Sequence, residues 1–129
     1  MIRATRQRIA IRRVFESADG PIAPEDVLAL AQETVSGLGI ATVYRSIKNL
    51  VEEGWLVAVE LPGQASRYEV AGKGHHHHFH CRSCGQVFEL LGCVEGFRNL
   101  IPKGFRVTGH EFVLYGYCQP CGRQRHVTA

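Results

Sequence analysis

The chain has 129 residues and a formal net charge of +3, and 45% of its residues are hydrophobic. This length allows one domain or two small ones, each of which would gain stability from a bound metal or a second copy of the chain. No apolar run approaches the roughly 18 residues of a membrane-spanning helix, and the arginine-rich segment Met1–Arg13 lacks the apolar centre of a signal peptide. The composition therefore predicts a cytoplasmic protein without a membrane span.

Residues 5–54 have the pattern of three short helices. Apolar residues recur at helical spacing over about residues 5–18, and a second helix is expected from Pro24 to near Ser36. The third helix is the clearest of the three. Its apolar stripe is formed by Val43, Ile47, Leu50 and Val51.

A hairpin is expected after these helices. Residues 55–61 are rich in β-forming residues, Pro62-Gly63 makes a turn, and Arg67–Val70 can return as the second strand. Three helices and a hairpin outline a winged helix, in which the third helix enters the major groove of DNA. The alternative is a small α+β domain in which Tyr44 and Arg45 are ordinary surface residues.

The start of the chain is strongly basic. Its arginines, which are not accompanied by any acidic residue, can bind DNA phosphates or can form a solvated helix face, and charge alone does not decide between the two. They are Arg3, Arg6, Arg8, Arg12 and Arg13.

The glycines of Ala71–Gly74 indicate a hinge between two domains. Beyond the hinge we expect a strand that ends at Cys81 and a second strand at Gln86–Leu90. A short helix over about Val94–Ile101 and a long strand at Phe105–Tyr117 should follow. The expected organisation is one domain at residues 1–70, a hinge at 71–74 and a second domain at 75–129.

Two Cys-x-x-Cys pairs supply four thiolates, which is a common donor set for structural zinc. The 33 residues between the pairs exceed the loop of a compact zinc ribbon, so a metal would join two ends of a subdomain. A redox dithiol and disulfides are the alternatives, although disulfides need an oxidising compartment and Cys93 makes the cysteine count odd. The expected zinc ligands are Cys81, Cys84, Cys118 and Cys121.

Four consecutive histidines precede the first cysteine pair. In an extended strand, successive side chains point to opposite faces. His75 and His77 would then share one face, and His76 and His78 would share the other. The sequence therefore predicts two separate pairs of nitrogen ligands on one strand.

Each histidine pair needs further donors to complete a metal site. Glu69 and Glu89 could complete one set, and His110 together with Glu95 could complete the other. Mixed imidazole and carboxylate donors suit divalent zinc, iron or manganese.

Four motifs follow one another along the chain. They are Thr5-Arg6-Gln7-Arg8, Ile40-Ala41-Thr42-Val43-Tyr44-Arg45, the His-rich segment His75–Gly85, and Tyr115–Cys118 with Cys121. Together they resemble the ferric uptake regulator family of bacterial metal-sensing repressors, which includes iron, zinc, manganese and peroxide sensors. The resemblance covers nearly the whole chain.

The resemblance implies an α+β protein with an N-terminal winged-helix DNA-binding domain and a small α/β dimerisation domain that holds structural zinc. It also implies a homodimer that binds palindromic operator DNA when metal is present. The four cysteines would hold the zinc. The regulatory metal ligands would be Glu69, His76, His78 and Glu89. The ligands of an additional site would be His75, His77, His110 and Glu95. The DNA contacts would come from Arg8, Thr42, Tyr44 and Arg45.

The chain departs from the family pattern in three places. Pro21 stands where many members have a histidine ligand before the second helix. Gly96 stands at the acidic position of the additional site, next to Glu95. The extra leading helix of many members is abbreviated or missing. The first two departures leave the coordination number of both histidine sites open.

These inferences predict a metal-dependent repressor of metal-homeostasis genes. Its regulatory metal would be zinc or iron, with zinc favoured because the sites contain few carboxylates. The alternative is a zinc-dependent hydrolase or deaminase-like enzyme with an open metal position. A deaminase would carry His-x-Glu and Pro-Cys-x-x-Cys, whereas this chain has no His-x-Glu, and Pro120 lies inside its second cysteine pair.

Overall fold

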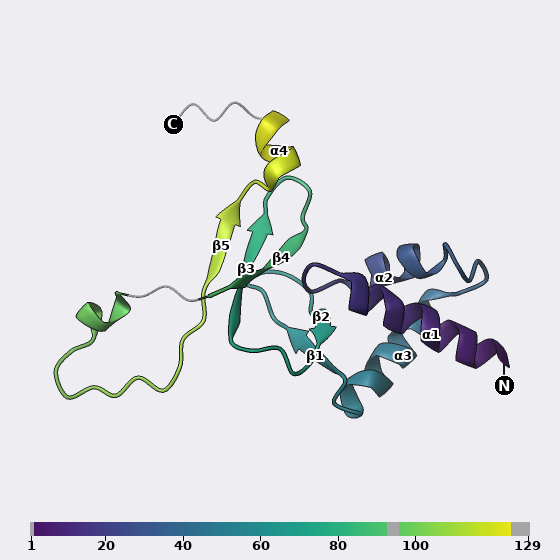
Figure 1. Ribbon diagram of the computed structural model, residues 1–129, viewed down its shortest axis with the longest axis horizontal. Helices are drawn as coiled ribbons and strands as arrows, with labels where there is room; N and C mark the ends of the chain where they lie inside the picture. Colours follow the sequence, from purple (N-terminus) through teal and green to yellow (C-terminus); the bar gives the residue numbers. More distant parts are fainter. Residues whose placement is uncertain (1, 93–95, 125–129) are drawn as a thin grey trace. The chain divides into compact units, whose positions relative to one another are not determined.

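The computed structural model describes residues 2–92 and 96–124 (Figure 1). Contacts divide the chain into two compact units, Met1–Lys73 and Gly74–Ala129. Helices predominate in the first unit and strands in the second, so the expected α+β class is confirmed. Within the described ranges, no helix is both long enough and apolar enough to cross a bilayer.

The first unit contains three helices followed by a two-stranded hairpin. The helices are α1 (Ile2–Ser17), α2 (Pro24–Ala31) and α3 (Ile40–Glu52), and the antiparallel strands are β1 (Leu56–Val59) and β2 (Arg67–Val70). Ile22 extends the hairpin, because its N–H and its C=O each form a 2.9 Å hydrogen bond with the backbone of Tyr68. The connection between α1 and α2 therefore ties the hairpin to the helices.

The apolar faces of the three helices form the core of the first unit. The stripe expected on α3 buries Val43, Ile47 and Leu50, and burying each of these side chains contributes about 1.5–3 kcal/mol. Val51, the fourth residue of the expected stripe, lies at its margin and is 37% exposed. This packing fixes which face of α3 is turned to solvent.

The second helix ends earlier than the sequence predicts, at Ala31 instead of near Ser36. Polar side chains after Ala31 compete for backbone groups, which favours a turn over further helix. Thr34 Oγ1 donates to the carbonyl of Ala31 at 3.2 Å, and Gln32 Nε2 donates to the carbonyl of Leu38 at 2.9 Å. The loop that follows is anchored by the buried side chain of Leu38.

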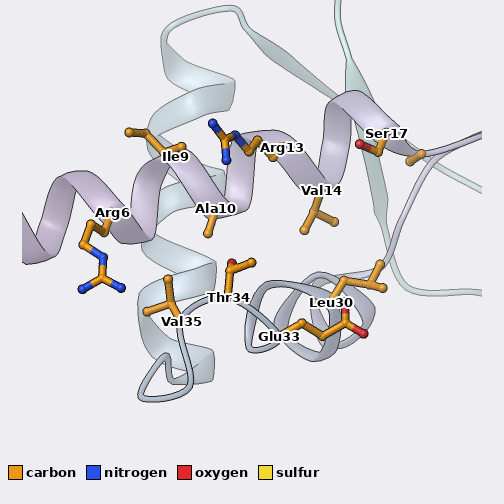
Figure 2. A pocket seen from close by; sticks show the side chains of 11 residues that line it. Arg6, Ile9, Ala10, Arg13, Val14, Ser17, Leu30, Glu33, Thr34 and Val35 are labelled. Atoms are coloured by element: carbon orange, nitrogen blue, oxygen red, sulfur yellow. The ribbon is translucent and has the colours of Figure 1, made fainter.

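An open groove of about 640 Å³ lies between α1 and the end of α2 (Figure 2). Ile9 and Leu30, on its two sides, are 45% and 47% exposed. In Figure 2, the side chain of Arg6 lies at the end of the groove near Val35. Helix α1 therefore turns one face to the core and leaves a second, half-apolar face in contact with solvent.

The second unit is built on a three-stranded sheet in the order β4-β3-β5 (Figure 1). Its strands are β3 (His76–Cys81), β4 (Val87–Leu91) and β5 (Val113–Gly116). β4 is antiparallel to β3, and β5 is parallel to β3 with His78 opposite Val113 and Cys81 opposite Gly116. The histidine-bearing strand is therefore central and projects side chains from both faces of the sheet.

Two expectations for the second unit need correction, and the structure adds one helix to them. The expected helix over 94–101 is a 3₁₀ turn, η1 (Phe97–Leu100), and residues 93–95 lie outside the described residues. The expected strand over 105–117 is limited to β5, which pairs with His78–Cys81 of β3. The short helix α4 (Gln119–Gln124) was not expected, although Pro120 suits its first turn.

Candidate metal centres and nucleic-acid interface

The first cysteine pair lies on the tight turn between β3 and β4. Cys81 N–H donates to the carbonyl of Gln86 at 2.9 Å, and Gly85 N–H donates to the carbonyl of Cys81 at 3.0 Å. Gly85 has a φ of 77°, a left-handed conformation that glycine adopts without steric cost. The Cys-x-x-Cys-Gly sequence therefore closes the turn that brings Cys84 near Cys81.

The second cysteine pair meets the first through β5, which runs parallel to β3 and ends beside Cys81. Cys118 N–H donates to Cys81 Sγ at 3.3 Å. The four Sγ atoms all lie within 4.8 Å of one another, and those of Cys84 and Cys118 are 3.8 Å apart. Thiolates around a tetrahedral zinc, each bonded at about 2.3 Å, are about 3.8 Å apart, so the four cysteines fit zinc.

The surroundings of Cys81 and of Cys118 shift the pKa values of the two thiols in opposite directions. Burial raises the pKa of Cys81, yet N–H groups of Cys118 and of the turn donate to its sulfur and bring the pKa down to about 5. At Cys118 the N–H of Cys121 lowers the pKa, but burial and the three neighbouring cysteine side chains raise it to about 12. A cation bound at this position would stabilise the thiolate form of Cys118.

Three histidines form a second group within the second unit. The ring centroids of His75 and His77 are 4.5 Å apart, and Nε2 of His75 lies 3.2 Å from Nε2 of His110. Ligand atoms of all three side chains lie within 4.8 Å of one another. Two imidazole nitrogens on a tetrahedral zinc, each bonded at about 2.0–2.1 Å, are about 3.3 Å apart, so this spacing also fits a metal.

His77 is the buried member of the second group. It is 3% exposed and stacks on Phe112 with 3.9 Å between ring centroids. Burial lowers the pKa of His77, and the neighbouring imidazoles of His75 and His110 lower it further. Since metals bind the neutral imidazole, this environment favours ligation.

The other two histidines of the run lie on the opposite face of β3, as strand alternation predicts. The ring centroids of His76 and His78 are 5.0 Å apart. His76 Nδ1 lies 2.7 Å from the carbonyl oxygen of Gly74, which can only accept, so Nδ1 carries the hydrogen and Nε2 keeps a lone pair for a metal. Glu89 is directly opposite His78 in the β3–β4 register, which places its side chain on the same face.

The remaining candidate ligands lie elsewhere in the chain. Glu69 lies on β2 of the first unit, is 3% exposed, and has Oε2 at 3.8 Å from Lys73 Nζ. Glu95 lies outside the described residues. His80 lies beside Tyr115, with 5.7 Å between ring centroids, and belongs to no metal-sized group in the described part of the chain.

The solvent-facing side of α3 carries the candidate DNA contacts. Tyr44 is 49% exposed, and Nη2 of the exposed Arg45 donates to Thr42 Oγ1 at 3.1 Å. Arg8 is exposed on α1. These side chains are accessible on rigid helices, as residues that read a ligand need to be.

One contact of this surface has no signal in the sequence. Tyr44 O–H donates to Glu25 Oε1 at 3.0 Å and so joins α3 to the first turn of α2. This hydrogen bond to a carboxylate raises the pKa of Tyr44. In the sequence, Glu25 is visible only as an acid at a helix start, a role that it shares with Asp26.

Comparisons with known proteins agree with one another. The family model of the ferric uptake regulator family matches residues 1–115. The ferric uptake regulation protein of Campylobacter jejuni is 33% identical over 129 residues, which cover 96% of this chain and 82% of that protein. A solved zinc-bound manganese uptake regulator is similar with a TM-score of 0.74 and 26% identity, covering 87% of each chain. The Helicobacter pylori ferric uptake regulator, described as having three functional metal binding sites, gives a TM-score of 0.68 and 25% identity over 93% of this chain and 81% of that one.

Proposed function

Because the chain belongs to the ferric uptake regulator family of metal-responsive transcription regulators, we propose that it is a homodimeric repressor that binds a palindromic operator when a regulatory metal is bound. It is a DNA-binding regulator and not the zinc hydrolase or deaminase that the sequence left open. The observation that carries the finer proposal is the division of four consecutive histidines between the two faces of β3. This division allows two metals with different roles.

The four cysteines hold a structural zinc. Support comes from the 3.8 Å spacing of Cys84 and Cys118 Sγ and from the hydrogen bond that the Cys118 N–H donates to Cys81. Zinc bound there would join the β3–β4 turn to the end of β5, and the binding free energy would add to the stability of the second unit.

The regulatory metal is held by Glu69, His76, His78 and Glu89. Glu69 precedes His76 by seven positions in the chain and lies in the last strand of the first unit, so a metal bound by all four residues would link the two units. A metal that binds one arrangement of the units more tightly increases its population. In a dimer, that arrangement would place two copies of α3 at the separation of two operator half-sites. Before metal binds, Lys73 provides positive charge near the Glu69 carboxylate.

The additional metal is held by His75, His77 and His110. Gly96, at the acidic position of the family pattern, provides no side-chain donor, and it begins η1 with a φ of 103°. The described residues therefore offer three nitrogen donors to this metal, and all three belong to the second unit. We expect this metal to support the second unit and to affect DNA binding only weakly.

Zinc is the regulatory metal that the donors favour. The proposed regulatory ligands are two imidazoles and two carboxylates, and zinc accepts four mixed nitrogen and oxygen donors in tetrahedral geometry. Pro21 replaces the histidine of the family pattern and cannot coordinate a metal, which limits the first unit's contribution to Glu69. A site with few ligands suits zinc better than a six-coordinate ion.

The DNA interface is the exposed side of α3 with support from α1. Tyr44 and Thr42 would contact base edges in the major groove, and Arg45 and Arg8 would contact phosphates. Dimerisation would use the second unit, which exposes large apolar side chains as monomers seldom do. Leu91, Leu100 and Phe105 are 86%, 82% and 70% exposed. A regulator of chromosomal genes would work in the bacterial cytoplasm.

The proposal is tested by measuring which DNA sequences the protein selects when different metals are added. Protein that retains only its cysteine-bound zinc would be mixed, under reducing and anaerobic conditions, with a pool of duplexes that have a randomised centre. Zinc, ferrous or manganous ions would then be added separately. We expect zinc to produce enrichment of a palindromic sequence. Enrichment that is equal with and without every metal would refute metal-dependent repression, and enrichment by iron or manganese alone would refute the choice of zinc.

A further inference from the structure

A carboxylate from a neighbouring helix holds the phenol of Tyr44. The O–H of Tyr44 donates to Glu25 Oε1 at 3.0 Å. Glu25 lies in the first turn of α2, and α2 packs against α3 through the buried side chains of Val27, Val43 and Ile47. The packing of the two helices therefore fixes the positions of the donor and the acceptor, although both groups lie at the surface.

This hydrogen bond changes what Tyr44 can offer to DNA. A phenol has one hydrogen to donate and lone pairs to accept with, whereas an ionised carboxylate can only accept. The bond to Glu25 therefore uses the single phenol hydrogen, and the oxygen that remains available is an acceptor beside an apolar ring. In the major groove, amino groups are the donors, and the thymine methyl is the apolar contact. An adenine–thymine pair offers both.

We propose that Glu25 determines what Tyr44 reads, because it occupies the phenol hydrogen and restricts Tyr44 to contacts with the amino groups of adenine and cytosine and with the thymine methyl group, so that an adenine–thymine pair, which offers both kinds of contact, is preferred. Guanine O6 and N7 and the phosphate oxygens are acceptors, so they would need a hydrogen that Tyr44 no longer has available. Glu25 acts through Tyr44 and need not touch DNA, which makes it a positioning residue. The inference rests on the proposed role of α3 as the DNA-reading helix.

A simpler role for Glu25 is stabilisation of the start of α2 by its negative charge. Asp26 lies in the same turn and carries the same charge, so Asp26→Ala removes an equal charge from the same turn and serves as the matched control. Glu25→Gln removes the charge but keeps an oxygen that can accept the phenol hydrogen. If Glu25 acts through the phenol of Tyr44, Glu25→Ala should change the DNA sequence that the protein selects, and both of these variants should leave it unchanged.

The experiment selects DNA with the full-length, metal-loaded protein from duplexes with a randomised centre. Wild type, Glu25→Gln and Asp26→Ala should enrich the same sequence. The preference of Tyr44→Phe for one base pair should be about fivefold weaker than that of wild type, which corresponds to the loss of a single hydrogen bond. Glu25→Ala should weaken the preference at the same base pair by a similar factor. In the absence of DNA, the Tyr44 phenol should ionise at lower pH in Glu25→Ala than in wild type. Ultraviolet absorbance measures this ionisation once the titration of the Tyr44→Phe variant, which reports the remaining tyrosines, has been subtracted.

The outcomes separate the inference from the proposed function. If wild type enriches no sequence with any metal, the proposed function fails and the inference fails with it. If Tyr44→Phe changes the enriched sequence but Glu25→Ala does not, the inference alone is wrong. Asp26→Ala or Glu25→Gln behaving like Glu25→Ala would also overturn it, because charge would then explain the effect. An unchanged phenol titration in Glu25→Ala would refute the contact itself.

Discussion

Replacing Cys84 with serine should unfold the second unit and leave the first unit folded. Among the described residues of the second unit, only His77, Cys81 and Val87 are buried, whereas the first unit has a continuous apolar core. Full burial of a valine contributes about 1.5–3 kcal/mol. Joining Cys84 to Cys118, 34 positions along the chain, closes a loop at a cost of about 4 kcal/mol. The buried apolar groups cannot offset this cost, so the proposed zinc would have to do so.

Two measurements check this prediction. Zinc content after gel filtration should fall by one ion per chain, and amide hydrogen exchange should lose protection in β3 and β5 but keep it in α1 and α3. Ser83→Ala is the matched control, because Ser83 is exposed on the same turn and only its backbone contacts Cys81. If Cys84→Ser keeps both its zinc and the protection of β3, the assignment of the four cysteines is wrong.

Three further predictions concern the switch and the DNA contact. Arg45→Ala should weaken binding to all DNA sequences and reduce by about 1 the slope of log affinity against log salt concentration, because it removes a phosphate contact. An unchanged slope in fluorescence anisotropy would place this residue outside the interface. His76→Ala should leave a folded, zinc-containing dimer whose affinity for the regulatory metal falls by at least about 10–100-fold, whereas His75→Ala should lose less affinity. If metal titrations followed by DNA binding show equal losses, the assignment of the histidines to two separate metal sites is wrong. Lys73→Met should tighten regulatory metal binding by up to about fivefold, because a competing positive charge near Glu69 is removed; calorimetry that finds no change would argue against a carboxylate ligand at this position.

The features that depend on local periodicity could be predicted from the sequence. The apolar stripe of α3 repeats every three or four residues and has a glycine just beyond its end, so this helix forms where the pattern places it. The alternation of His75–His78 follows from the period of a strand and needs no knowledge of its neighbours.

The features that depend on contacts distant in sequence could not be predicted. The end of α2 is influenced by the hydrogen bond from Gln32 to Leu38, and the length of β5 is limited by how much of β3 pairs with it. The bond between Tyr44 and Glu25 requires two helices to be packed first, and no motif in either helix indicates it. In none of the three cases does the local pattern of apolar residues indicate the partner.

The parallel pairing of β3 with β5 also affects how quickly each unit can form. Helices and hairpins need only nearby residues, whereas His78 must find Val113, 35 positions later (78 to 113), before β5 joins the sheet. The first unit should therefore fold in the fast phase. The Cys81–Cys84 turn should meet Cys118 and Cys121 later, because these two cysteines lie far along the chain. Zinc captured by this turn would shorten the search for the second cysteine pair. The slow refolding phase should then accelerate with zinc concentration, so that the supply of metal limits the rate at which new regulator becomes available.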